Sequence, residues 1–208
     1  MKIFLTIAVS LSFTAVVIAQ NIVDSGFTNK SDAKNLIVNG VKEGKWIQYY
    51  KVKDKVVHET KSKHAPFYRL TMYKAGKAVG IARDYYKSGK LWGETPYVNG
   101  NINGLRKMYD DNGVLILTDT VFADKENGII KIFYLNGKLK IECPFINDTS
   151  NKQAVISFEP HGAIHSYQGA EPTIPYGISG KLNGVLKIYN EDGSLKLKTT
   201  FLNGIAIK

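Results

Sequence analysis

Residues 80–91 read Gly80-Ile-Ala-Arg-Asp-Tyr85-Tyr-Lys-Ser-Gly89-Lys-Leu91, and this stretch decides the fold because its frame recurs along the chain. The frame is an aromatic residue, a glycine four positions later, and Leu or Ile two positions after that glycine. Most copies carry another glycine five positions before the aromatic residue. The aromatic residues of the copies are Tyr85, Tyr109, Phe133, Phe158 and Tyr189, at offsets of 24, 24, 25 and 31 residues. Such regular recurrence predicts a repeat protein.

Each unit has the pattern of a β-hairpin. Six strand-forming residues, such as 129–134, follow the first glycine, and a turn such as Asn136-Gly137 follows them. A second strand-like stretch, such as Leu91–Val98, then leads through another Asn-Gly pair into the next unit. Asn-Gly accommodates the positive φ angles of tight hairpin turns. Because no stretch after Ala19 keeps a helical apolar period, we predict an all-β fold, an elongated antiparallel meander of about six repeated β-hairpins.

The hairpin repeats predict a domain over residues 36–208, with a degenerate first copy that begins at Gly44. Insertions interrupt the period near residues 51–70 and 166–177, and residues 20–35 read as a loose polar leader. The chain has 208 residues with 44% hydrophobic and 22% charged residues, a composition that excludes global disorder. The single cysteine, Cys143, excludes a disulfide framework and is expected to be a buried small hydrophobe.

The first 19 residues predict export. Lys2 precedes an apolar run from Ile3 to Ala19, and small residues stand before Gln20, as in a cleaved signal peptide. The alternative is an uncleaved anchor, but the run is short against the ~20 apolar residues that a membrane span needs. We therefore expect a signal peptide over residues 1–19 and a location in the periplasm, the cell envelope or the extracellular space.

The segments Gly80–Leu91 and Gly104–Gly113 resemble the MORN-repeat variant of proteins labelled as YwqK-type antitoxin components of toxin–antitoxin systems. The resemblance covers roughly residues 36–208. It implies a β-hairpin repeat array that binds a protein, with a toxin-like protein as one candidate, or an envelope component. A signal peptide departs from an antitoxin that meets an intracellular toxin, so we expect a partner outside the cytoplasm.

Known catalytic and metal-binding motifs are missing from the sequence. It contains no nucleophile elbow, zinc-protease motif, phosphate loop or dinucleotide fingerprint. His161 and His165 lack a third metal ligand nearby. We therefore expect no catalytic residues, no metal and no cofactor, and keep an uncharacterised enzyme only as a further alternative.

The best candidate for a binding surface combines the repeated aromatic residues with a cation two positions before each of them. Equivalent positions in neighbouring hairpins lie about 9.5 Å apart, so both sets would form rows on one face of the sheet. The candidate residues are Arg83, Tyr85, Lys107, Tyr109, Lys131, Phe133, Lys187 and Tyr189. A protein partner is the leading prediction. The alternatives are a structural envelope protein that binds anionic lipid or glycan through a basic stripe, and lysines that only solvate the outer face. Export makes nucleic acid an unlikely ligand.

Overall fold

The computed structural model describes residues 22–53, 56–61, 63–126, 128–146, 181–203 and 205–207. Its one short helix, η1, is a 3-10 turn over Lys30–Asp32, and every other regular element in these ranges is a strand. The strands are β1 (Leu36–Val38), β2 (Val41–Lys53), β3 (Val56–Thr60), β4 (Phe67–Lys74), β5 (Lys77–Tyr86), β6 (Leu91–Val98), β7 (Asn101–Ile102), β8 (Gly104–Tyr109), β9 (Leu115–Phe122), β10 (Lys125–Glu126), β11 (Gly128–Phe133), β12 (Leu139–Ile146), β13 (Lys181–Leu182), β14 (Gly184–Tyr189), β15 (Leu195–Leu202) and β16 (Ile205–Ile207).

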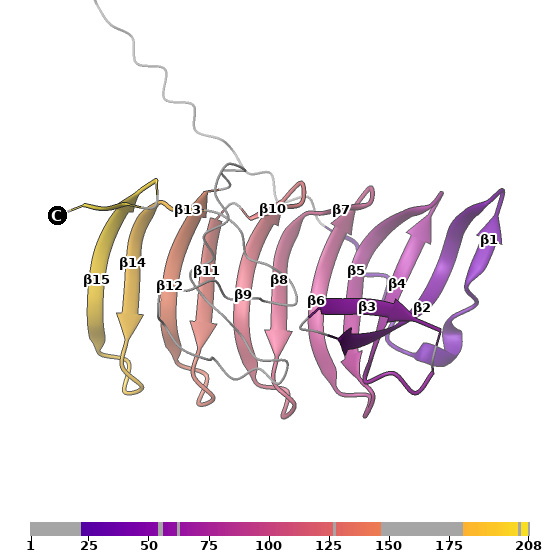
Figure 1. Ribbon diagram of the computed structural model, residues 1–208, viewed down its shortest axis with the longest axis horizontal. Helices are drawn as coiled ribbons and strands as arrows, with labels where there is room; N and C mark the ends of the chain where they lie inside the picture. The colour runs from indigo at the N-terminus through magenta and orange to yellow at the C-terminus, as the bar shows by residue number, and fades with distance from the viewer. Residues whose placement is uncertain are drawn as a thin grey trace, which may run out of the picture.

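The strands form one elongated sheet in which neighbours follow chain order (Figure 1). The order along the sheet is β1-β2-β4-β5-β6-β8-β9-β11-β12-β14-β15-β16, and the strand pairs are antiparallel. The predicted all-β meander of hairpins is therefore confirmed. No helix in the described ranges is both long and apolar enough to cross a membrane.

Two kinds of turn alternate along the array. Inside a hairpin the Tyr86 N–H donates to Lys90 O, and Gly89, at φ +89°, lies in the turn. Between hairpins the chain reverses over two residues with positive φ, as at Asn99-Gly100. Ala123-Asp124 adopts the same conformation without a glycine, at φ +50° and +64°. The Asp124 carboxylate compensates by accepting a 2.6 Å hydrogen bond from the Ile102 N–H.

A β-bulge accompanies the repeated aromatic residue in each of four hairpins. Asp84 pairs with Gly93 but Tyr85 pairs with Leu91, so Trp92 is the extra residue on its strand. The same shift falls between Met108 and Tyr109, between Ile132 and Phe133, and between Ile188 and Tyr189. A bulge bends its strand and increases the local twist. The recurring bulge therefore gives these four hairpins the same local distortion.

Cross-strand pairing separates the side chains into two faces. Arg83 pairs with Glu94, and Glu94 pairs with Lys107. This row continues through Thr118, Lys131, Glu142, Lys187 and Lys198. Directly paired residues point to one side of a sheet and their chain neighbours to the other. We call the side that bears this row the ladder face and the opposite side the groove face.

Each half of the sheet has its own apolar cluster. The first contains Phe27, Tyr68, Leu70 and Tyr85 and lies on the ladder face of β4 and β5. The second lies on the groove face of β9 to β14 and contains Leu117, Ile130, Ile132, Ile141, Cys143 and Leu186. Cys143 is 0% exposed, which confirms its prediction as a buried residue. The cores thus sit on opposite faces.

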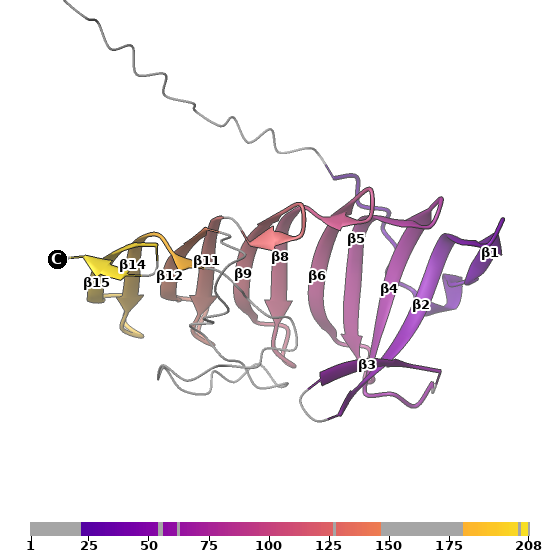
Figure 2. The same ribbon diagram turned by 45° about the horizontal axis from the view of Figure 1, so that its top comes forward.

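The predicted insertion near residues 51–70 contains β3. This strand pairs with the last residues of β2 in a hairpin turned across the direction of the main strands (Figures 1 and 2). Gln48 Nε2 donates a 3.0 Å hydrogen bond to Glu59 Oε2, which brings β3 to the groove face. The predicted signal peptide, the Phe158 copy and the insertion near residues 166–177 lie outside the described residues.

Candidate functional site

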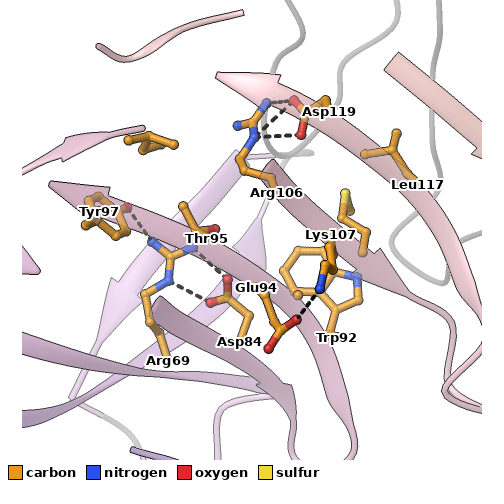
Figure 3. Close-up of a pocket in the computed structure, with 13 residues that line it drawn as sticks. Arg69, Asp84, Trp92, Glu94, Thr95, Tyr97, Arg106, Lys107, Leu117 and Asp119 are labelled. Carbon is orange, nitrogen blue, oxygen red and sulfur yellow. Dashed lines mark hydrogen bonds and ion pairs between the residues drawn. The ribbon is translucent and has the colours of Figure 1, made fainter. Parts of the chain in front are cut away.

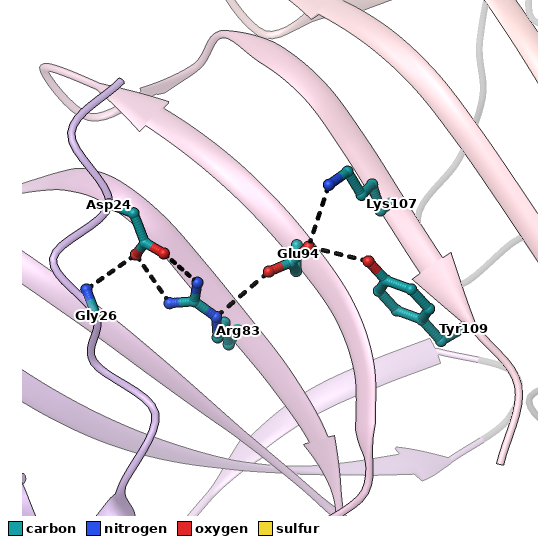
Figure 4. A network of polar contacts seen from close by, with 6 residues as sticks. All are labelled: Asp24, Gly26, Arg83, Glu94, Lys107 and Tyr109. Atoms are coloured by element: carbon teal, nitrogen blue, oxygen red, sulfur yellow. Dashed lines mark hydrogen bonds and ion pairs between the residues drawn. The ribbon is translucent and has the colours of Figure 1, made fainter. Parts of the chain in front are cut away.

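Residues 22–35, which the sequence suggested were loose, lie as a strap across the ladder face. Arg83 donates to both carboxylate oxygens of Asp24, over 3.0 Å and 2.5 Å (Figure 4). The Gly26 N–H donates to the same carboxylate over 3.0 Å. The hydrogen bonds from Arg83 hold the pKa of Asp24 below its usual range and raise the pKa of Arg83. The strap therefore places a carboxylate on the first cation of the repeat.

Phe27 anchors the strap three residues further on. Its side chain is 1% exposed and packs with Tyr68, Leu70 and Tyr85. The rings of Tyr68 and Tyr85 stack with their centroids 5.0 Å apart. Burying a phenylalanine side chain stabilises a contact by roughly 1.5–3 kcal/mol. A tertiary contact of this kind leaves no periodic pattern in the strap sequence, which explains why the leader seemed loose.

The end of the strap covers the edge of β2. Asn35 Nδ2 donates to Ile47 O over 2.9 Å, and the Ile47 N–H donates to Asn35 Oδ1 over 2.8 Å. The N–H groups of Lys34 and Asn35 both donate to Lys45 O. The Asn35 side-chain amide thus forms the two hydrogen bonds with the Ile47 backbone that a neighbouring strand would form. The strap is therefore fixed at Asp24, Phe27 and Asn35.

Glutamates interrupt the row of cations on the ladder face. Glu94 lies 3.4 Å from Arg83 Nε and 3.7 Å from Lys107 Nζ (Figure 4). Glu142 lies 3.8 Å from Lys131 Nζ and 2.7 Å from Lys187 Nζ. These glutamates stand on the second strand of their hairpins, so a pattern taken from the first strands alone does not include them. The row therefore alternates in charge from Arg83 to Lys107 and from Lys131 to Lys187, and it is not a continuous basic stripe.

The aromatic residues of the candidate site differ in exposure. Tyr85 is buried under the strap, whereas Tyr109, Phe133 and Tyr189 are half-buried. Tyr109 OH donates a 3.0 Å hydrogen bond to Glu94, and burial first, with that carboxylate second, raises the pKa of Tyr109 to about 12. Each aromatic residue faces a leucine of its own hairpin: the partners are Leu91, Leu115, Leu139 and Leu195. The row therefore alternates aromatic and aliphatic groups.

Buried ion pairs lie on the groove face around a cavity of about 90 Å³ (Figure 3). Arg69 donates two 2.7 Å hydrogen bonds to Asp84 and a third, of 3.4 Å, to Tyr97 OH. Arg106 pairs with Asp119, a carboxylate that is 0% exposed. The charges of each pair compensate one another. The partners of each pair come from different strands, so spacing along the chain does not reveal this cluster.

A second cavity of about 280 Å³ adjoins it, also lined by Arg69 and Tyr97. Gln48, which holds Glu59, also accepts a 3.1 Å hydrogen bond from Tyr73 OH. Burial raises the pKa values of Tyr73 and Tyr97. Thr71, 2% exposed, also lines the cavity, and its hydroxyl has no hydrogen-bond partner within the described part of the chain. A small molecule in this second cavity could form a hydrogen bond with the Thr71 hydroxyl.

The described residues contain no group of three or more metal-ligating side chains. His161 and His165, the pair noted in the sequence, lie outside them. Burial raises the pKa of the Cys143 thiol to about 12, so the thiol stays protonated near neutral pH.

Three segments of the chain match the MORN repeat variant: residues 78–99, 126–147 and 182–203. Each segment coincides with one hairpin, β5–β6, β11–β12 or β14–β15, and includes a cation, an aromatic residue and the bulge between paired strands. No curated protein matches the chain significantly. The three matched segments are similar to the MORN repeat variant, and in each of them the repeat unit is the hairpin described above.

Proposed function

We propose that this repeat protein is an exported, non-catalytic binding protein whose partner is another protein that docks along the ladder face from β8 to β15. The observation that carries the proposal is the strap. A segment of the chain itself already occupies one end of this face through a carboxylate on Arg83 and a phenyl ring beside Tyr85.

The rest of the ladder face repeats the groups that hold the strap. Lys107 and Lys131 stand where Arg83 stands in its hairpin, and their side chains are each 42% exposed. Tyr109 and Phe133 follow them as Tyr85 follows Arg83. Exposed cations beside half-buried aromatic and leucine side chains can bind both charged and apolar groups of a protein segment. We therefore place the partner on these hairpins.

The alternating charges weigh against a structural protein held to anionic lipid or glycan by a basic stripe. A lysine that already pairs with Glu94 or Glu142 attracts a distant polyanion less than an unpaired one. Charge-driven attraction would also fade with salt. Export rests on residues 1–19, and the antitoxin-type resemblance makes a toxin-like protein outside the cytoplasm one candidate partner.

The test is affinity capture from the envelope fraction of the source cells at moderate salt. We would compare the unmodified chain with the variant Lys107→Gln, Lys131→Gln, Lys187→Gln. The matched control, Lys74→Gln, Lys77→Gln, Lys125→Gln, removes the same charge from exposed positions at turns. We expect one stoichiometric protein that the first variant loses and the control keeps. Equal capture by both variants, or capture only of lipid or glycan that is lost as salt rises, would refute the proposal.

A second candidate function rests on the groove face. Thr71 presents a buried hydroxyl with no partner among the described residues to a cavity of about 280 Å³ lined by tyrosines. Buried hydroxyls are normally hydrogen-bonded, so a small polar ligand could supply the bond. Thr71→Val would then abolish the binding of that ligand without changing capture of a protein on the ladder face.

A further inference from the structure

We infer that the partner presents a segment in which an acidic residue is followed three positions later by an aromatic residue, as in the strap, and that its carboxylate docks between Lys107 and Lys131. This inference rests on the proposed function, because it names the partner chemistry that the ladder face would recognise.

The strap supplies the recognition chemistry. Asp24 and Phe27 are three residues apart and contact the same hairpin. Asp24 accepts hydrogen bonds from its cation, Arg83, and Phe27 packs beside its aromatic residue, Tyr85. The strap also passes close to the backbone: the Val23 carbonyl oxygen lies 3.1 Å from the position that a Cβ would take at Gly80. The glycine that opens this unit therefore leaves room for the segment. The equivalent glycines of the later units face side chains of the chain itself: Ile22 and Pro96 at Gly104, Thr120 at Gly128, and Pro144 at Gly184.

The charged row contains a gap that suits a carboxylate. Between Arg83 and Lys107 stands Glu94, and between Lys131 and Lys187 stands Glu142. Between Lys107 and Lys131 the row holds Thr118 instead, which pairs with both lysines. Thr118 is 8% exposed and carries no charge. An acidic side chain from a partner would complete the alternation of charge at this position.

The strap sets the spacing of the two recognition groups. Between Asp24 and Phe27 the chain turns at Gly26, which has a φ of +63° and donates a hydrogen bond to the Asp24 carboxylate. This turn lets two side chains three residues apart reach the cation and the aromatic residue of one hairpin. A partner carboxylate over Thr118 would thus place an aromatic residue three positions away near Tyr109 or Phe133. The chemistry identified is that of an acidic, aromatic-containing peptide segment.

The probe is a synthetic peptide that copies residues 21–32 and carries a fluorophore, titrated with the full chain and followed by fluorescence anisotropy. Two altered peptides each carry one change. The first has Asn at the position of Asp24, and the second has Ala at the position of Phe27. In the protein, Thr118→Glu fills the gap with a fixed carboxylate. Lys131→Gln removes one of the two cations beside the gap and adds no charge. Lys125→Gln, at an exposed turn, matches the change in net charge.

We expect saturable binding that weakens about tenfold or more with either altered peptide and with either Thr118→Glu or Lys131→Gln. Lys125→Gln should bind as the unmodified chain does. Absence of binding to the unmodified chain, or binding by Thr118→Glu and Lys131→Gln as tight as that of the unmodified chain, would overturn the inference. If capture from cells still depends on Lys107, Lys131 and Lys187, the proposed function survives that failure. If capture does not depend on them, the proposed function fails as well.

Discussion

The two halves of the sheet use the same hairpin in opposite ways. Over β4 and β5 the apolar cluster lies on the ladder face under the strap, and the groove face holds the Arg69–Asp84 ion pair. Over β9 to β14 the apolar cluster lies on the groove face, and the ladder face carries exposed lysines. The backbone of the repeat therefore does not decide which face is covered.

The groove-face positions of successive hairpins explain the difference. Ala82 and Asp84 of β5 become Ile130 and Ile132 in β11. β8 has Arg106 and Met108 at these positions, and β14 has Leu186 and Ile188. Meanwhile every one of these hairpins keeps a cation and an aromatic residue on the ladder face. A fixed ladder face beside a changing groove face is what a repeated docking surface requires.

The largest expected effect separates a buried ion pair from an exposed one. Asp119→Asn should lower the free energy of unfolding by about 3–5 kcal/mol, because it removes the buried carboxylate that neutralises the largely buried Arg106 guanidinium. Glu142→Gln on the ladder face should cost less than about 1 kcal/mol, since its lysine partners are partly exposed. Urea unfolding of both variants measures the contrast. Similar losses would mean that the two faces are equally solvated.

The two apolar clusters should respond alike although they lie on opposite faces. Leu70→Ala and Ile132→Ala each remove a side chain that is 0% exposed, and each should cost about 2–5 kcal/mol in urea unfolding. Leu105→Ala, at a position that is 48% exposed, is the control and should cost less than about 0.5 kcal/mol. A negligible loss for Leu70→Ala would show that the strap and the ladder-face cluster are not packed as described.

Acid should loosen the strap by protonating Asp24. The pKa of Asp24 is lowered from its usual value of 3.8, so its contact with Arg83 stabilises the docked strap above that pH. This contribution is lost as the pH falls below 3.8 and through the lowered pKa. The amide signal of Gly26, which donates to Asp24, reports the change by NMR. Asp24→Asn should abolish the titration, and its persistence in that variant would assign it to another group.

The smallest effect concerns the thiol of the second cluster. Cys143 is 0% exposed and burial raises its pKa to about 12, so a thiol reagent at pH 8 should react about a hundredfold or more slowly with the folded chain than with the urea-unfolded chain. Comparable rates would indicate that the groove face of β12 opens readily. Ile132→Ala should accelerate the reaction by loosening the same cluster.

The sequence was sufficient to predict the hairpins but not how their faces are occupied. Asn99-Gly100 forms the predicted turn because these residues accept positive φ, whereas the equivalent turn at Ala123-Asp124 depends on the hydrogen bond to Ile102. The recurring bulge is set by pairing between strands, which the spacing along one strand does not reveal. The all-β meander followed from local patterns and was therefore predictable.

The candidate site was predicted only in part. The cations and aromatic residues of the repeat could be named from their spacing. Glu94 and Glu142 enter their row through cross-strand register, so the sequence suggested a continuous basic stripe instead. Along the chain Asp24 lies 59 residues from Arg83, and Phe27 lies 41 residues from Tyr68. No periodicity links the strap residues to their partners. The groove-face ion pair likewise depends on strand register, which places Arg69 of β4 opposite Asp84 of β5.

The central claim is that the ladder face of β8 to β15 binds the partner, and hydroxyl-radical footprinting of the captured complex tests it most directly. Aromatic side chains on both faces report separately. We predict that oxidation of Tyr109, Phe133 and Tyr189 falls when the partner is bound, while oxidation of Tyr50 and Tyr73 in the groove stays unchanged. Protection of Tyr50 and Tyr73 with no change at Tyr109, Phe133 and Tyr189 would contradict the account and place the partner on the groove face.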